Sequence, residues 1–187
     1  MEKPKRIILA ITGASGAAYG IQTLKTLKDM RFEVHLVISP IGAQVIQEEL
    51  KIPLDKIQTM AHYVYQTDDL SASIASGSFH TAGMLVVPCS IKTLSGIANS
   101  YAENLIQRAA DVCLKEGRQV LLAVRETPLH VGHLRLLTQA ALTGAVIYPL
   151  SPSFYSHPET IDDLIVTTVG RMLNRFGIDN DLFQPWN

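Results

Sequence analysis

The sequence predicts an α/β protein built on a doubly wound, mainly parallel sheet of the Rossmann or flavodoxin-like kind. Short runs of apolar and β-branched residues recur along the chain, and stretches with helical periodicity lie between or after them. The runs are apolar at successive positions rather than at alternate ones. A strand that is apolar on both faces belongs in a parallel sheet with helices on both sides. We therefore expect helices to cover both faces of one sheet.

The elements follow one another in βα order. The expected strands are Ile7–Ile11, Val34–Ile38, Met84–Val87, Val120–Val124 and Ala145–Tyr148, each a short apolar run bounded by polar or turn residues. The expected helices are Gly16–Met30, Gly42–Leu50, Thr93–Ala98, Asn104–Lys115, Leu134–Leu142 and Thr160–Phe176. Ser39, Ser90 and Thr127-Pro128 are typical helix-start signals. Lys51–Ser78 is less periodic, and Ser71–Ser78 is expected to form a polar loop.

Composition favours one domain over residues 1–187 that binds a small partner. A chain of 187 residues can bury roughly 70% of its unfolded surface around one core. The net charge of −1 and the lack of a basic tract argue against nucleic acid or a membrane surface as partners. The apolar runs are too short for a signal peptide or a membrane span. Two cysteines, Cys89 and Cys113, are too few for a disulfide framework, so we expect a cytoplasmic protein.

The segment Arg6–Gly20 combines a buried strand, a turn of small residues and an amphipathic helix. Gly13 and Gly16 allow a tight turn, and the N–H groups that begin the helix favour an anion. The turn is not the dinucleotide fingerprint, because Ser15 stands where G-x-G-x-x-G has its second glycine. It is either a phosphate cradle or an ordinary strand-to-helix connection.

Polar residues follow every apolar run, and in an open α/β sheet ligands bind at that edge. In chain order these residues are Gly13-Ala-Ser15, Ser39-Pro40, Pro88-Cys-Ser-Ile-Lys-Thr93, Arg125-Glu126-Thr127-Pro128 and Ser151-Pro-Ser-Phe-Tyr155. Taken singly, each also has an ordinary structural explanation, such as a helix cap or a surface ion pair. Hydroxyls and helix starts suit a phosphorylated planar cofactor, and the second strand is followed by no acid that would bind the ribose of NAD. FMN fits these residues better than NAD.

Metal and thiol chemistry have weak support. His130 and His133 have no third ligand in the sequence pattern, and the acidic pairs Asp68-Asp69 and Asp162-Asp163 lack further spaced carboxylates. We expect no metal site. Cys89 is either a nucleophile or a small core residue.

Five motifs, in order, resemble the UbiX/Pad family of flavin prenyltransferases, once labelled aromatic acid decarboxylases. They are Thr12-Gly-Ala-Ser-Gly-Ala17, Pro88-Cys-Ser-Ile-Lys-Thr-Leu-Ser-Gly96, Arg108-Ala-Ala-Asp-Val112 with Leu114-Lys-Glu116, Val124-Arg-Glu-Thr-Pro-Leu129 and Phe154-Tyr155. The resemblance covers essentially the whole chain. It implies transfer of a dimethylallyl group from dimethylallyl phosphate to reduced FMN at N5 and C6, which makes prenylated FMN for a partner UbiD-type decarboxylase. It also implies a homododecamer with active sites at subunit contacts.

The resemblance further implies a role for individual residues. Those matched to FMN contacts are Gly13, Ala14, Ser15, Ser39, Ser90, Ile91, Lys92, Thr93 and Arg125. Those matched to the phosphate substrate are Arg108, Lys115, Tyr155 and Arg171, and those matched to catalysis are Ser15, Glu49, Lys115 and Glu126. Either the departing phosphate or Glu49 could remove the proton during ring closure.

Two other functions remain open from the sequence. The chain could be an FMN-dependent decarboxylase acting on a cysteine or an aromatic acid, although cysteine decarboxylases carry Pro-Ala-Ser-Ala-Asn-Thr where this chain has Pro88–Thr93. It could also be a flavin carrier without chemistry. The cations and the tyrosine beyond the expected FMN site, Lys115, Arg171 and Tyr155, argue against a carrier.

Overall fold

A six-stranded, all-parallel sheet forms the centre of the molecule. The computed structural model describes residues 5–184. The strands are β1 (Arg6–Ile11), β2 (Glu33–Ile38), β3 (Tyr63–Tyr65), β4 (Gly83–Cys89), β5 (Gln119–Val124) and β6 (Val146–Ile147). Their order across the sheet is β3-β2-β1-β4-β5-β6. The direction of winding therefore reverses between β1 and β4, which is where doubly wound proteins bind their ligands.

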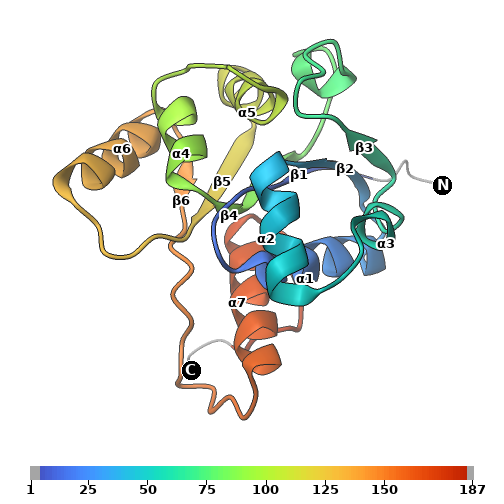
Figure 1. Ribbon diagram of the computed structural model, residues 1–187, viewed down its shortest axis with the longest axis vertical. Coiled ribbons are helices and arrows are strands. Elements are labelled where there is room, and N and C mark those ends of the chain that lie inside the picture. The colour runs from blue at the N-terminus through green and yellow to red at the C-terminus, as the bar shows by residue number, and fades with distance from the viewer. Residues whose placement is uncertain (1–4, 185–187) are drawn as a thin grey trace.

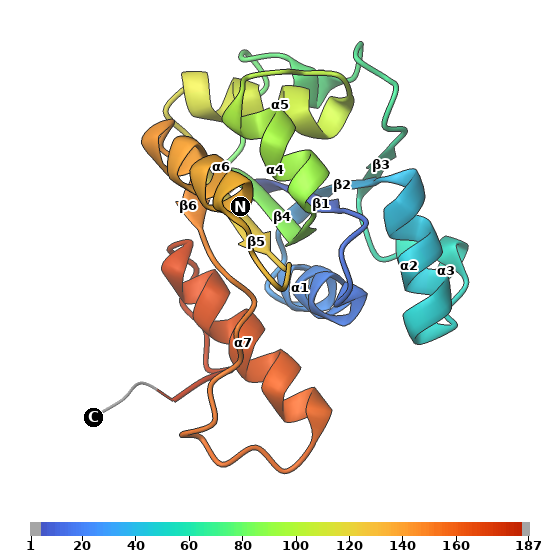
Figure 2. The ribbon, with the colours of Figure 1, turned by 60° about the vertical axis from the view of Figure 1, so that its left-hand side comes forward.

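Helices cover both faces of this sheet (Figures 1 and 2). One face carries α4 (Ile91–Ala98), α5 (Leu105–Lys115) and α6 (Val131–Leu142). The other face carries α1 (Ala17–Asp29) and α7 (Ile161–Arg175), with α2 (Pro40–Leu50) and the short α3 (Leu54–Gln58) beside them. The segment between β6 and α7 extends away from the sheet without regular structure (Figures 1 and 2).

The strand sequences explain why there are two cores. In β1, Ile8 and Ala10 face the core under α4 and α5, whereas Ile7, Leu9 and Ile11 face the core under α1 and α7. All five are essentially inaccessible to water. Because successive side chains of a strand point to opposite faces, a strand buried on both sides must be apolar throughout. This confirms the fold class and the five expected strands.

The stretch Lys51–Ser78 contains more regular structure than its weak periodicity predicts. It contains α3, β3 and a 3₁₀ helix at Ser73–Ala75, none of which was expected. β3 has only three residues, largely exposed, and it exists through its parallel pairing with β2. Such a strand depends on a distant partner rather than on its own apolar pattern.

Helix caps confirm two of the three expected start signals. The Ser39 hydroxyl accepts a hydrogen bond from the amide of Gly42, and the Ser90 hydroxyl accepts one from the amide of Thr93. Thr127-Pro128 was wrong as a start signal, since α6 begins at Val131 and His130 is its N-cap. Within residues 5–184, no helix has the length and apolar character needed to cross a membrane.

Candidate active site

The carboxyl ends of β1 and β4 are tied together by one buried hydroxyl. Thr12 Oγ1 donates to the carbonyl of Pro88 at 2.7 Å and accepts from the amide of Ser90 at 2.8 Å. The turn after β1 and the start of α4 therefore lie side by side at the switch point of the sheet. Thr12 was not among the expected site residues, because its role depends on Pro88 and Ser90, which are distant in the sequence.

A small compartment of about 240 Å³ opens beside this junction. Its lining comes from three loops that follow strands, and comprises Gly13, Ala14, Ser15, Ser90, Ile91, Arg125 and Glu126. Arg125 Nε donates to the Ser15 carbonyl at 3.2 Å, so Arg125 is bound to the β1 turn rather than to Glu126. The Glu126 carboxylate accepts the amide of Thr127 at 2.9 Å.

A larger compartment of about 400 Å³ adjoins the small one and shares Gly13 and Ser90 with it. Hydroxyls of Ser39, Thr67, Ser90 and Thr93 line it, together with Lys92 and apolar side chains of Ile41 and Ile106. Gly13 is required here, because a Cβ at this position would lie 2.4 Å from Ile41 Cγ2. Hydroxyls at two helix starts suit a phosphate, and the apolar walls suit a flat ring, so the residues present fit FMN.

A carboxylate of the protein itself binds the start of α1. Glu49, at the end of α2, accepts hydrogen bonds from the amides of Gly16 at 3.0 Å and Ala17 at 2.8 Å. Of the two alternatives for this turn, the contacts favour an ordinary strand-to-helix connection over a phosphate cradle, since these amides are paired with a carboxylate. The physical expectation of a negative charge at the helix start was correct. Glu49 lies beside Ser15 through this contact.

Tyr155 and Arg171 both act on the side chain of Tyr148, on the α7 side of the molecule. Both lie near Tyr148, whose pKa is raised by burial, while the positive charge of Arg171 acts in the opposite direction. Arg171 also donates to Asn174 Oδ1 at 3.1 Å. Tyr155 belongs to the extended segment before α7 and is 42% exposed.

Lys115 and Arg108 lie away from the two compartments. The helix α5 starts next to Asn104 of the larger compartment and runs back along the sheet, so its last residue, Lys115, is at the edge where β5 begins. Lys115 Nζ pairs with Glu116 Oε1 at 2.7 Å. Arg108 pairs with Asp111 at 3.3 Å. Within a single chain Lys115 therefore lies away from the Ser15 side of the sheet, and Arg108 does not line either compartment.

Cys89 and the histidine pair have structural roles. Cys89 is fully buried, and burial raises the pKa of its thiol to about 12, so the thiolate needed of a nucleophile does not form near neutral pH. His130 Nδ1 accepts the amide of Gly132 at 3.0 Å, and its ring contacts that of His133. The described part of the chain contains no group of three or more His, Cys, Asp or Glu residues able to hold a metal ion.

Fold and site together define a doubly wound α/β protein with a mononucleotide pocket at its switch point. The family model described as Flavoprotein matches residues 1–172, and a flavin prenyltransferase UbiX of Escherichia coli K12 is 52% identical over 185 residues, covering 97% of this chain and 98% of that protein. The chain belongs to the Flavoprotein family and, within it, to the UbiX flavin prenyltransferases.

Two solved structures support the same assignment. A UbiX protein crystallised with FMN and dimethylallyl pyrophosphate superimposes with a TM-score of 0.97 at 43% identity, covering 99% of this chain and 98% of that one. A dodecameric protein from Escherichia coli O157:H7, described as an FMN-dependent UbiX-like decarboxylase, gives a TM-score of 0.94 at 40% identity and covers 97% and 99% of the two chains.

Proposed function

We propose that this chain is a flavin prenyltransferase. It transfers a dimethylallyl group from dimethylallyl phosphate to N5 of reduced FMN and closes a second bond at C6. The observation that carries the proposal is the pair of joined compartments, one lined by hydroxyls at helix starts and the other by Ser15, Arg125 and Glu126. The identity of 52% to a flavin prenyltransferase supports it independently.

The two compartments give FMN one orientation. Ser39, Ser90 and Thr93 would hold its phosphate, and the apolar wall of Ile41 and Ile106 would hold its ring, which would extend toward Ser15 in the smaller compartment. When bound, reduced FMN supplies the nucleophilic N5. Arg125 holds the Ser15 turn, so it fixes where the Ser15 hydroxyl lies relative to the ring. Ser15 can then accept or return a proton at N5.

Departure of the phosphate requires positive charge and a proton. The allylic C–O bond breaks as the N5–C bond forms, and the electron pair leaves with the phosphate oxygen. We infer that Arg171 and Tyr155 bind that phosphate and that Glu126 donates a proton to it. Charge-assisted contacts of this kind contribute about 3 kcal/mol each in comparable sites.

Lys115 and Arg108 join this site from a second copy of the chain. Within one chain they lie elsewhere, yet the resemblance places both with the phosphate. A protein 40% identical to this chain is a dodecamer, so neighbouring copies are available to supply them. The exposed apolar side chains of α6, which include Leu142 at 83% and Val131 at 62%, provide a surface for such contacts.

The product is passed on rather than consumed by this chain. Prenylated FMN has no further use in a site built to make it, and the resemblance assigns its use to a UbiD-type decarboxylase. A decarboxylase activity of the chain itself has less support, because the relative at 52% identity is a prenyltransferase and burial raises the pKa of the Cys89 thiol.

Flavin analysis after anaerobic incubation with reduced FMN and dimethylallyl phosphate tests the proposal. We expect a prenylated flavin, and the pyrophosphate is assayed in parallel. Unchanged FMN with released carbon dioxide from an aromatic or cysteinyl acid would indicate a decarboxylase. Unchanged FMN without any product would indicate a carrier.

A further inference from the structure

A further hollow adjoins the larger compartment. It has a volume of about 520 Å³, within the range of small-molecule sites, and is lined by Lys92, Ser95, Gly96, Asn99, Tyr101, Glu103 and Gln107. Lys92, Glu103 and Gln107 also line the larger compartment. These three residues therefore form the boundary between the two spaces.

This boundary is held in place by a buried side chain. Gln107 is only 3% exposed, and its Oε1 accepts the amide of Glu103 at 2.9 Å. It packs directly on Gly96, where a Cβ would lie 2.1 Å from Gln107 Nε2. The next turn is anchored as well, since Leu105 donates its amide to the Thr67 carbonyl at 2.8 Å. The backbone of Glu103 is therefore fixed at the boundary.

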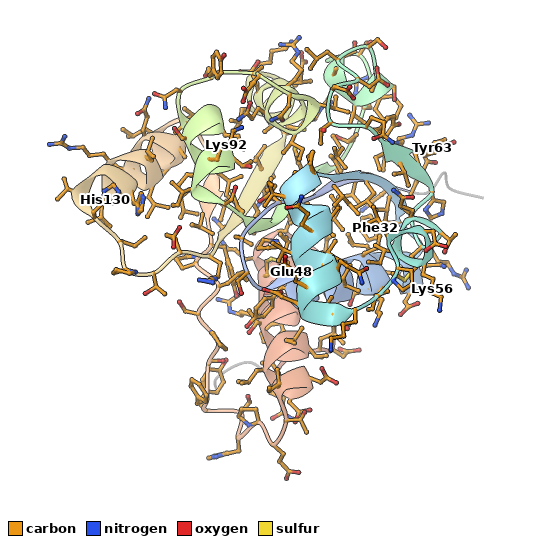
Figure 3. The ribbon with its side chains drawn as sticks, viewed as in Figure 1. Phe32, Glu48, Lys56, Tyr63, Lys92 and His130 are labelled. Carbon is orange, nitrogen blue, oxygen red and sulfur yellow. The ribbon has the colours of Figure 1, made fainter. Side chains whose placement is uncertain are left out.

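Glu103 places a carboxylate at this boundary. Its Oε2 lies 3.6 Å from Lys92 Nζ, so the pair joins α4 to the loop before α5. Lys92 lies on α4, as Figure 3 shows. Both side chains are well exposed, at 80% for Lys92 and 50% for Glu103, so the ion pair itself is weak. The pair would affect a ligand in two ways: Glu103 contributes a negative charge, and the charge of Lys92 is neutralised by Glu103.

We propose that Glu103 restricts the site to FMN and rejects FAD. This inference rests on the proposed function, which places the FMN phosphate in the larger compartment. FAD carries a second phosphate and an adenosine beyond that phosphate, and both would have to pass Glu103 into the 520 Å³ hollow. The second phosphate would meet a carboxylate of like charge, and Lys92 would be paired with Glu103 instead of with the ligand. FMN ends at its first phosphate, so no part of it has to pass Glu103 into the hollow.

Equilibrium dialysis of the full-length protein against equal amounts of FMN and FAD tests this inference. Chromatography of the bound flavins gives their ratio directly. We expect Glu103→Gln, which keeps the shape and removes the charge, to raise the bound FAD-to-FMN ratio by about ten-fold. Glu103→Ala should raise it at least as much. Glu48→Gln serves as the matched control, since Glu48 is an exposed glutamate on α2 (Figure 3), and it should leave the ratio unchanged.

The outcomes separate this inference from the proposed function. Failure of the parent protein to bind FMN would overturn the proposed function. FMN binding with equal binding of FAD would overturn only the role of Glu103. An unchanged ratio in both Glu103 variants, with melting temperatures like that of the parent, would also overturn it, because something other than Glu103 would then exclude FAD.

Discussion

Glu49 connects two helices to the proposed reaction site. Its carboxylate binds the first amides of α1, and these amides directly follow Ser15. The position of Ser15 is therefore set by Arg125 on one side and by Glu49 on the other. Any contribution of Glu49 to proton transfer comes in addition to this positioning.

We expect Glu49→Ala to lower the free energy of unfolding by about 1 kcal/mol, because the amides of Gly16 and Ala17 lose their acceptor and the start of α1 loses a favourable charge. Glu49→Gln should lose less, since one accepting oxygen remains. Urea unfolding measures both. Glu48→Ala, one residue earlier on the same helix, is the control. Equal stability of Glu49→Ala and the control would show that the cap contributes nothing.

Lys115→Ala and Glu126→Gln should retain FMN but lose about 100-fold or more in the rate of prenylation, because their proposed roles concern the leaving phosphate. Arg171→Ala should mainly raise KM. Flavin absorbance measures occupancy, and product formation under anaerobic conditions measures rate. Loss of FMN together with activity in Lys115→Ala would place this residue in the cofactor site instead.

At the scale of elements, the edge of the sheet at β3 depends on a buried polar network. His35 in β2 is buried, and its Nε2 donates to Glu33 at 3.1 Å while its Nδ1 accepts from the Tyr65 hydroxyl at 2.8 Å. An ionised carboxylate can only accept, so Nε2 carries the proton, and in the neutral imidazole Nδ1 is then the acceptor for the Tyr65 hydroxyl. Arg6 completes the network through Glu33 at 2.8 Å. β3 is therefore held by side chains as well as by its pairing with β2.

This network predicts how stability depends on pH. Burial lowers the pKa of His35, despite the opposing effect of Glu33, while Arg6 and His62 lower it further. The folded state thus binds fewer protons at His35 than the unfolded state, so stability falls as pH drops below about 6.5. Burial alone would raise the pKa of Glu33, but hydrogen bonds from His35 and Arg6 hold it below its ordinary value, so Glu33 acts only at lower pH.

Urea midpoints between about pH 5 and about pH 7 measure this effect. His35→Gln should flatten the dependence, and the exposed His80→Gln should not. Equal slopes for the two variants would contradict the assignment to His35.

The elements also show which parts of the structure can be predicted from sequence. Strands buried on both faces, such as β1, are apolar at every position, and this pattern is visible locally. β3 and Glu49 are different, because their roles depend on partners elsewhere in the chain: His35 for β3 and the α1 amides for Glu49. The sequence did not predict the roles of Gln107 and Thr12 either, because these roles also depend on contacts with other segments of the chain. Lys115 is one of the site residues named by resemblance. No sequence pattern shows that it lies away from Ser15 within one chain.

At the scale of the whole molecule, a site that takes Lys115 from a neighbouring copy requires an oligomer. Light scattering at micromolar concentration should show an assembly far larger than a monomer, consistent with a dodecamer. If Lys115 acts in a neighbouring copy, then co-assembled Lys115→Ala and Glu126→Gln chains should regain activity, because some sites would receive an intact residue from each. Each variant assembled alone is the control. A monomer, or mixed assemblies as inactive as either variant, would contradict a site shared between copies.

The most direct test is the mass of the flavin recovered after the parent protein reacts with reduced FMN and dimethylallyl phosphate in the presence of a chelator. We expect a flavin heavier by one C5 prenyl unit, formed at the same rate with and without the chelator, since protein cations are proposed to neutralise the phosphate. Recovery of FMN with its mass unchanged would contradict it.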